Sequence, residues 1–418
     1  MGCLVAGSLA ACSTLDRKNA VPQELMTKSY IEGMPGVRYK VASRTGLQAM
    51  VDDIRVGQEK PEAFLDRVND SYLALSGVGD YGALGACLLT GWTERGDRPE
   101  FSLVTGVSTG AMIAPFAYLG SDYDYVLKRT FTDVDQKDIF IELGLTGALF
   151  GDAFADTSPL YKLISEFITP ELLQKIAFEY TVRNRWLVVA TTNLDAGVPV
   201  LWNMGKLAAV GTPESLQLFR KILLASAAIP GAFPPVMIDV MADGKHYQEM
   251  HVDGGASTEL FLYPSALSEM ALKEGVVTKF RNRQAYIIRN ARLDSDWRQI
   301  ERNTLSIMGR AVDQLIQSQG GGDIYRTYLV TQRDGVHFNL AYIGPDFKVP
   351  HKKEFDRHYM NALFDYARNL SRAGYPWAHS PPGYDLPLKE AVNRQVLRQD
   401  QALKNYRAQN KALSKPAQ

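Results

Sequence analysis

A serine between two glycines marks the stretch of the sequence best suited to chemistry. Ser108 lies in Gly106-Val107-Ser108-Thr109-Gly110, between a short apolar run and a longer apolar segment. Such a sharp turn from strand to helix presents the hydroxyl outward, and the glycines let the two elements pass closely. The helix N-terminus beside the hydroxyl favours negative charge. We therefore expect Ser108 to be a nucleophile.

Acyl transfer also requires a base for the serine proton and hydrogen-bond donors for the developing oxyanion. Gly77-Val78-Gly79 follows a strand-like run and ends 29 residues before Ser108, so two adjacent strands would bring its backbone N–H groups beside the hydroxyl. Asp253 ends another apolar run, where its carboxylate would protrude from the C-terminal edge of an α/β sheet. We expect residues 77–79 to form the oxyanion hole and Asp253 to be the base. Each motif alone also fits an ordinary turn.

The elements that must position these groups alternate along the chain. Apolar runs of strand length are separated by segments with helical periodicity. Strands are predicted at 72–76, 101–106, 186–191, 198–203, 285–289, 328–331 and 338–343, with another ending at 251–252, and helices at 83–92, 214–228, 295–318, 353–373 and 389–411. Residues 122–180 are apolar enough to form a cap over a site. The alternation predicts an α/β fold: a three-layer sandwich with a mainly parallel central sheet flanked by helices.

Four separated motifs resemble, in order and in type, those of the patatin-like phospholipase family. They are the glycine-rich loop 77–82, the elbow 106–110, the stretch 225–235 that reads Ala-Ser-Ala-Ala-Ile-Pro-Gly-Ala-Phe-Pro-Pro, and Asp253-Gly254-Gly255. The resemblance covers residues 70–290. It implies a serine acyl hydrolase that cleaves lipid acyl esters through a Ser-Asp dyad, without histidine, metal or organic cofactor.

By this resemblance Ser108 is the nucleophile, Asp253 is the base, and the backbone at 77–79 is the oxyanion hole. Two positions depart from the family loop, which usually reads Gly-Gly-Gly-x-Arg/Lys-Gly. Val78 replaces the middle glycine, and a β-branched residue is strained if that position has positive φ. Tyr81 replaces the cation, which removes a partner for phosphate. A neutral ester is therefore an alternative to phospholipid as substrate.

The first residues resemble the end of a bacterial lipoprotein signal. A short apolar run ends in Leu-Ala-Ala before Cys12, and in such signals the cysteine that follows the small residues is lipidated. The run is too short to span a bilayer. A basic segment would complete the signal, so we expect the native start to lie upstream of Met1. The resemblance implies a lipoprotein of the bacterial cell envelope, anchored at Cys12 in the outer membrane and facing the periplasm or the exterior.

The chain is therefore expected to have four parts. They are a lipoprotein-type signal at 1–12, a tether and edge segment at 13–65, a patatin-like catalytic domain at 66–380, and a polar helical tail at 381–418. The tether assignment depends on the polar composition and prolines of its first half.

Composition restricts the partners and leaves two other functions open. Acidic and basic residues number 46 each, which gives no reason to expect nucleic acid. The six histidines never pair with cysteine at metal-ligand spacing, so no metal site is expected, and Cys87 is predicted to lie in a buried helix. One alternative is an α/β-hydrolase whose Ser-Asp-His triad is completed by His337 or a later histidine. The other is a lipoprotein that binds lipid without turning it over.

Overall fold

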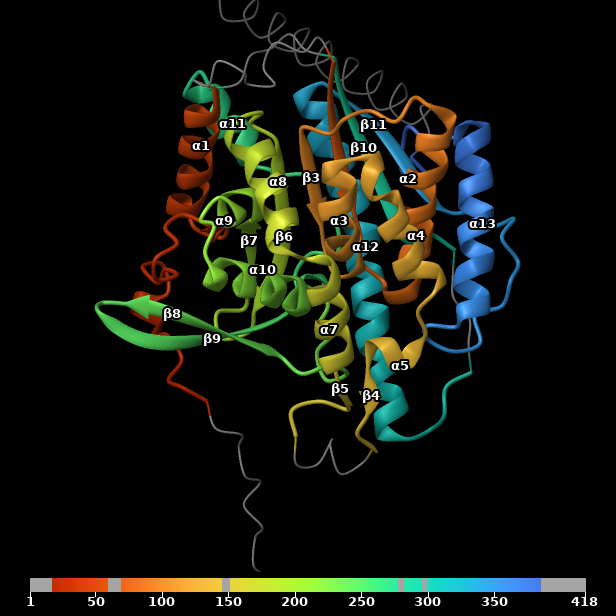
Figure 1. The fold of residues 1–418 in the computed structure, drawn as a ribbon, viewed down its shortest axis with the longest axis horizontal. Coiled ribbons are helices and arrows are strands. Elements are labelled where there is room, and N and C mark those ends of the chain that lie inside the picture. The colour runs from red at the N-terminus through yellow and green to blue at the C-terminus, as the bar shows by residue number, and fades with distance from the viewer. Residues whose placement is uncertain (1–16, 59–68, 145–150, 277–281, 295–298, 385–418) are drawn as a thin grey trace, which may run out of the picture.

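The computed structural model describes residues 17–58, 69–144, 151–276, 282–294 and 299–384 of the chain. Within these ranges a nine-stranded sheet forms the centre of the molecule (Figure 1). Its strands are β1 (Arg38–Tyr39), β2 (Asn69–Leu75), β3 (Leu103–Gly106), β6 (Trp186–Asn193), β7 (Val198–Asn203), β8 (Val236–Ala242), β9 (Lys245–Asp253), β10 (Asn282–Arg292) and β11 (Val336–Ile343). A separate small sheet pairs β4 (Ile141–Glu142) with β5 (Ala155–Asp156).

The order of the strands determines where the predicted site residues meet. Along the main path the order is β1-β7-β6-β3-β2-β10-β11, and β6, β3, β2, β10 and β11 run parallel to one another. Strands β3 and β9 lie along consecutive parts of the same edge of β6: Gly106 pairs with Val189, and Asp253 pairs with Thr191. The end of β9 therefore meets the turn that follows β3.

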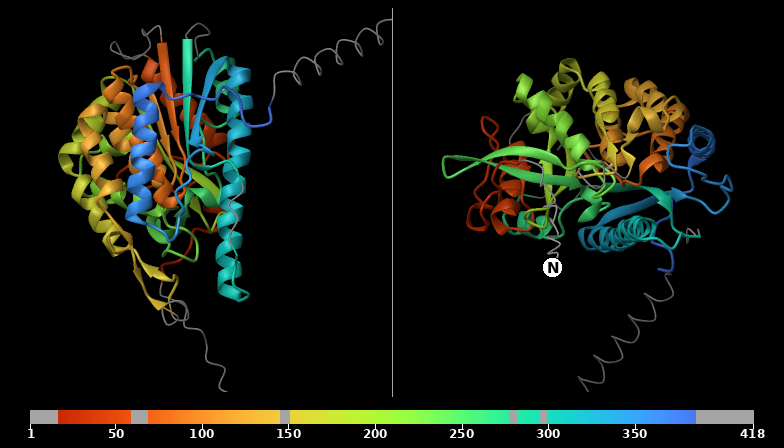
Figure 2. Two further views of the ribbon diagram at one scale, coloured as in Figure 1. Left: turned by 90° about the vertical axis from the view of Figure 1, so that its right-hand side faces the viewer. Right: turned by 90° about the horizontal axis from the view of Figure 1, so that it is seen from below.

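Helices cover both faces of the sheet, as the side view in Figure 2 shows. The helices are α1 (Arg44–Gln58), α2 (Ala83–Arg95), α3 (Thr109–Leu119), α4 (Asp124–Thr132), α5 (Gln136–Ile139), α7 (Ser158–Phe167), α8 (Pro170–Thr181), α9 (Met204–Ala208), α10 (Pro213–Ser226), α11 (Leu267–Lys273), α12 (Thr304–Asp334) and α13 (Arg357–Gly374).

Alternation of side chains along each strand divides the core between these two faces. Leu73 and Leu75 of β2 belong to the cluster with α2, α3, α8, α10 and α13, whereas Ala74 between them belongs to the cluster with α12. Helices α1 and α11 pack on the same side as α12, against β6. The predicted three-layer α/β sandwich with a mainly parallel sheet is confirmed.

Several local predictions are also confirmed. The predicted cap at 122–180 contains α4, α5, α7 and α8, which pack on the larger core cluster. Cys87 is fully buried in α2. Strand β1 pairs with β7 at the edge of the sheet. The four predicted parts of the chain stay predictions.

The structure corrects two predictions. The strand predicted at 328–331 is wrong, because these residues belong to the last turns of α12. Their β-branched and aromatic composition favours a strand, but packing of Tyr328 on Phe338 of β11 stabilises the helix instead. Helix α1 was also missed, since the polar sequence around it was assigned to a tether. Cys12 and the tail helix at 389–411 lie outside the described residues. Among the described helices, none is long and apolar enough to cross a membrane.

Candidate active site

The chain turns at Ser108 as a nucleophile elbow requires. Ser108 lies between β3 and α3 with φ 52° and ψ −124°, a conformation that costs a non-glycine residue about 1–3 kcal/mol. A Cβ on Gly106 would lie 2.5 Å from the carbonyl oxygen of Gly110, and a Cβ on Gly110 would collide with the backbone of Leu75. The two glycines are therefore required by close approach of backbone, as the sequence predicted.

Ser226 holds the elbow in this strained conformation. The Ser108 N–H donates to Ser226 Oγ at 2.9 Å, and Ser226 Oγ donates to the carbonyl oxygen of Ala190 at 2.7 Å. Ser226 is fully buried at the end of α10, so these bonds link the elbow to β6. The sequence marked residues 225–235 as a motif but gave Ser226 no role. The signal available in the sequence was a polar residue at the end of an apolar helix.

Asp253 reaches Ser108 because β9 ends beside the elbow. The Ser108 and Asp253 side chains both line a pocket beside one another, and the Gly255 N–H donates to Asp253 Oδ1 at 2.7 Å. Burial raises the pKa of Asp253 above its ordinary value, and the interactions with Ser108 and Gly255 oppose this only in part. The predicted nucleophile and base are thus side by side, with the carboxyl group more basic than an exposed aspartate.

The loop at residues 77–79 lies against the serine because β2 and β3 are neighbours. A Cβ on Gly77 would be 2.6 Å from Ser108 Cβ, so only glycine fits there. Val78 has φ 89°, the left-handed conformation in which its β-branched side chain is strained. Gly79 follows with φ 52°. The Gly77 N–H lies against the carboxyl group of Glu259, which leaves Val78 and Gly79 as the donors better placed for an oxyanion.

An apolar pocket of about 300 Å³ opens at Ser108. Its wall includes aliphatic and aromatic side chains from α3, α4 and the cap helices α5 and α7: Met112, Phe116, Phe131, Ile139, Leu160, Leu163, Ile164 and Phe167. A pocket with this lining suits an acyl chain. Carboxyl groups line its other side: Asp80, Asp253, Glu259, Asp313 and Glu354. None of the described lining residues is lysine or arginine.

Two histidines bear on the alternative of a Ser-Asp-His triad. His337 is exposed on β11 and does not line the pocket. His351 does line the pocket, where its Nε2 lies 2.8 Å from Asp80 Oδ2. The same oxygen accepts the Phe355 N–H at 2.8 Å, so Asp80 orients the segment that carries the histidine. In the described part of the chain, no cluster of histidine, cysteine and acidic residues is arranged to hold a metal ion.

Glu259 is a site residue that the sequence analysis missed. It lines the pocket six residues after Asp253, and its side chain is 1% exposed. Its partner is the buried Arg289 of β10, whose Nη1 lies 3.5 Å from Glu259 Oε1. The available signal was a single acidic residue directly before the apolar run that begins at Leu260.

Comparison with known proteins relates the part of the chain that carries this site to a family. A model of the patatin-like phospholipase family matches residues 73–262, a range that contains all the groups just described except Arg289 and the pocket residues after 262. The crystal structure of VipD from Legionella pneumophila superposes with a TM-score of 0.34 and 11% sequence identity, covering 73% of this chain and 67% of VipD. Comparison with curated protein sequences gave no match.

Proposed function

Residues 73–262 are a patatin-like phospholipase domain, and we propose that this lipid acyl hydrolase cleaves its esters through a dyad of Ser108 and Asp253. The observation that carries the proposal is that the Ser108 and Asp253 side chains meet at a strained elbow in an apolar pocket. A base of raised pKa in contact with the nucleophile is what a reaction without histidine requires.

In the first half-reaction, Asp253 accepts the Ser108 proton while Oγ attacks the ester carbonyl carbon. The N–H groups of Val78 and Gly79 donate to the oxyanion of the tetrahedral intermediate. Asp253 then gives the proton to the leaving alcohol oxygen as its bond to carbon breaks, and an acyl-Ser108 remains. In the second half-reaction Asp253 takes a proton from water, which attacks the acyl group, and returns a proton to Ser108.

A serine-directed fluorophosphonate probe tests the proposal. We expect labelling of the protein and its loss in Ser108→Ala, together with an acyl-enzyme that hydroxylamine traps during turnover. Retained turnover in His351→Ala would support the dyad over a triad. Labelling that persists in Ser108→Ala, or a protein that binds lipid without any turnover, would contradict the proposal.

The lining of the pocket favours an uncharged ester over an anionic phospholipid. Five carboxyl groups line the pocket, and the described lining residues contain no lysine or arginine to pair with a phosphate. Tyr81, which stands where the family usually carries a cation, packs on His351 with ring centroids 5.0 Å apart. A matched series of diacylglycerol, phosphatidylcholine and phosphatidylglycerol with identical acyl chains tests this choice. Faster cleavage of phosphatidylglycerol than of diacylglycerol would overturn it.

We also propose that a lipid at Cys12 anchors the protein in the cell envelope, as the resemblance of the first residues implies. Anchoring would hold the pocket close to lipid substrates. Metabolic palmitate labelling that is lost in Cys12→Ser, expressed with a complete signal, is the expected result. A mature protein without an acyl group at Cys12 would contradict it.

A further inference from the structure

Glu259 is a buried carboxyl group beside the dyad that the mechanism above does not use. A Cβ on Gly77 would lie 2.7 Å from Glu259 Oε1 and 3.3 Å from Ser108 Oγ. A Cβ on Gly255 would collide with Glu259 Oε2 and lie 3.2 Å from Asp253 Oδ1. The Glu259 carboxyl group therefore fills the space between the oxyanion loop and the turn that follows the base.

Two neighbouring elements hold Glu259 in place, one through its backbone and one beside its side chain. The Glu259 N–H donates to Asp323 Oδ2 of α12 at 2.8 Å, and the Leu260 N–H donates to the same oxygen at 3.2 Å. On the other side lies the guanidinium of Arg289 from β10, which is 2% exposed. The backbone and the side chain of Glu259 are thus held by different layers of the sandwich.

This pair is poorly satisfied, which argues against a purely structural role. Among the described residues, Glu259 Oε1 and the Nε and Nη1 atoms of Arg289 are buried and have no hydrogen-bond partner. A buried ion pair with unsatisfied atoms contributes little to stability, because desolvation offsets the attraction between the charges. Proteins retain such violations mainly at functional sites.

From this placement we propose that Glu259 is a positioning residue whose carboxylate, held between Gly77 and Gly255, sets the charge environment in which Asp253 takes up the Ser108 proton. The inference rests on the proposed function of Ser108 and Asp253. Arg289 supports this role, since its positive charge favours the ionised form of Glu259.

The charged groups that face Glu259 agree with this role. Burial raises the pKa of Glu259, the charge of Arg289 lowers it, and the charges of Asp253 and Asp323 raise it. Two carboxyl groups this close resist being ionised together, so a negative Glu259 makes Asp253 hold a proton more strongly. A stronger base accepts the serine proton more readily at neutral pH.

The test is the pH dependence of kcat/KM for a short p-nitrophenyl ester. In Glu259→Gln, Asp253 loses a neighbouring negative charge, so the acid limb should move to lower pH by about half a unit or more. Glu259→Asp keeps the charge and should restore the limb toward its original position. Glu249→Gln is the matched control, because it removes a buried glutamate that pairs with a buried arginine away from the pocket. Its acid limb should not move.

Arg289→Met provides a second variant that acts through Glu259. Loss of the cation lets Glu259 keep its proton, so the acid limb should again move to lower pH, whereas a merely structural pair would lower activity without moving the limb. An unchanged limb in folded, probe-reactive Glu259→Gln, or a shift to higher pH in Arg289→Met, would overturn the proposal. If Ser108→Ala or Asp253→Asn kept turnover, the dyad itself would fail, which is a separate outcome.

Discussion

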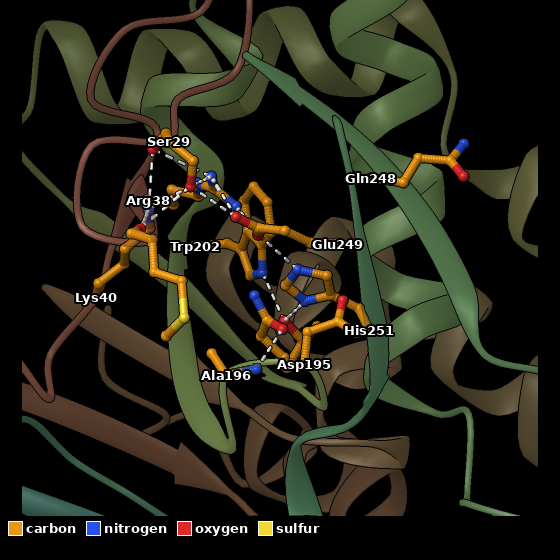
Figure 3. A network of polar contacts seen from close by, with 12 residues as sticks. Ser29, Arg38, Lys40, Asp195, Ala196, Trp202, Gln248, Glu249 and His251 are labelled. Atoms are coloured by element: carbon orange, nitrogen blue, oxygen red, sulfur yellow. Dashed lines mark hydrogen bonds and ion pairs between the residues drawn. The ribbon is translucent and has the colours of Figure 1, made fainter. Parts of the chain in front are cut away.

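Within the described part of the chain, two glutamate–arginine pairs are buried on both sides and differ in how their carboxylates are bonded. Glu249 of β9 pairs with Arg38 of β1 at 2.5 Å, and both carboxylate oxygens have partners (Figure 3). Glu259 pairs with Arg289 at 3.5 Å, and Oε1 has no hydrogen-bond partner among the described residues. The first pair ties the N-terminal segment to the β8–β9 hairpin, and the second lies in the pocket. The first pair therefore serves stability, whereas the second serves function.

The hydrogen bonds of the first pair determine the state of its histidine. Trp202 Nε1 donates to Thr191 Oγ1 at 2.8 Å, so the Thr191 hydroxyl is left to donate to His251 Nδ1 at 2.8 Å. His251 must then carry its proton on Nε2, which lies 3.1 Å from Glu249 Oε2. Burial lowers the pKa of His251, which keeps the ring neutral. Every polar atom in this chain from Trp202 to Glu249 therefore has a partner.

The pKa values of the two glutamates are shifted in opposite directions. Burial raises the pKa of Glu249, but the hydrogen bond from His251 and the charge of Arg38 outweigh burial and hold the pKa well below its ordinary value. For Glu259, burial dominates and the pKa is raised. The hydrogen-bonded carboxylate of Glu249 thus stays charged although Arg38 Nε has no partner among the described residues, whereas the carboxyl group of Glu259, whose Oε1 has none, holds its proton more strongly.

The largest expected effect is the loss of activity when Ser108 or Asp253 is replaced. Ser108→Ala and Asp253→Asn should each lower kcat by about 10⁴-fold or more while the unfolding free energy changes little, because they remove the nucleophile and the base. The double variant should be little worse than either single variant, since the two residues act as a unit. Steady-state kinetics and urea unfolding measure both quantities. An active Asp253→Asn would make Asp253 only a turn residue.

The second prediction compares the stability that is lost when the arginine of each pair is replaced. Arg38→Met leaves Glu249 buried without its main countercharge and should lower the unfolding free energy by about 3–5 kcal/mol. Arg289→Met should cost clearly less, because burial raises the pKa of Glu259 and the carboxyl group can take up a proton once the cation is gone. Urea titrations of both variants at pH 7 give the comparison. Equal losses would mean that the incomplete hydrogen bonding around Arg289 does not distinguish the pairs.

The third prediction concerns the pH dependence of stability. Because the folded pKa of Glu249 is lowered, its contribution is present above the unfolded pKa and is lost as pH falls through the folded pKa. The folded pKa of Glu259 is raised, so the folded state holds a proton that the unfolded chain has lost, and stability falls as pH rises above the ordinary glutamate pKa. Glu259→Gln removes this loss, at most about 1.4 kcal/mol per pH unit.

Urea unfolding at pH 5, 6, 7 and 8 checks this sign. Relative to the wild type, Glu259→Gln should gain stability as pH rises. Glu249→Gln should be less stable throughout this range, and its deficit should shrink only in more acidic solution. A Glu259→Gln curve parallel to that of the wild type would show that Glu259 titrates normally in the folded protein.

The sequence predicted the positions of Ser108 and Asp253 better than their surroundings, for a physical reason. Ser108 and Asp253 are placed by local turns after strands, and such turns have glycine signatures that can be read locally. Glu259 meets Gly77 and Arg289 only through the sheet, so its role depends on contacts between segments far apart in the sequence. The strand predicted at 328–331 failed similarly, because its local propensity gave way to packing on β11.

The last prediction has the smallest effect and concerns a positive charge placed in the pocket, as Arg38 places one beside Glu249. Tyr81→Arg should raise kcat/KM for phosphatidylglycerol relative to the matched diacylglycerol by up to about tenfold, because a charge-assisted bond to phosphate, which contributes about 1.5–3 kcal/mol when it is fully made, is made only in part here. Asp80 is the adjacent residue and Glu354 also lines the pocket, so part of the new charge will pair with protein carboxylates instead of phosphate.

Tyr81→Gln is the matched control for this last change, since it removes the same ring from His351 and Tyr359 without adding charge. We expect its substrate ratio to stay at the wild-type value, while both variants lose some packing. A ratio that rises equally in Tyr81→Gln would assign the effect to space in the pocket. A ratio that is unchanged in folded, probe-reactive Tyr81→Arg would show that position 81 does not face the headgroup, and that the missing cation does not explain a preference for uncharged esters.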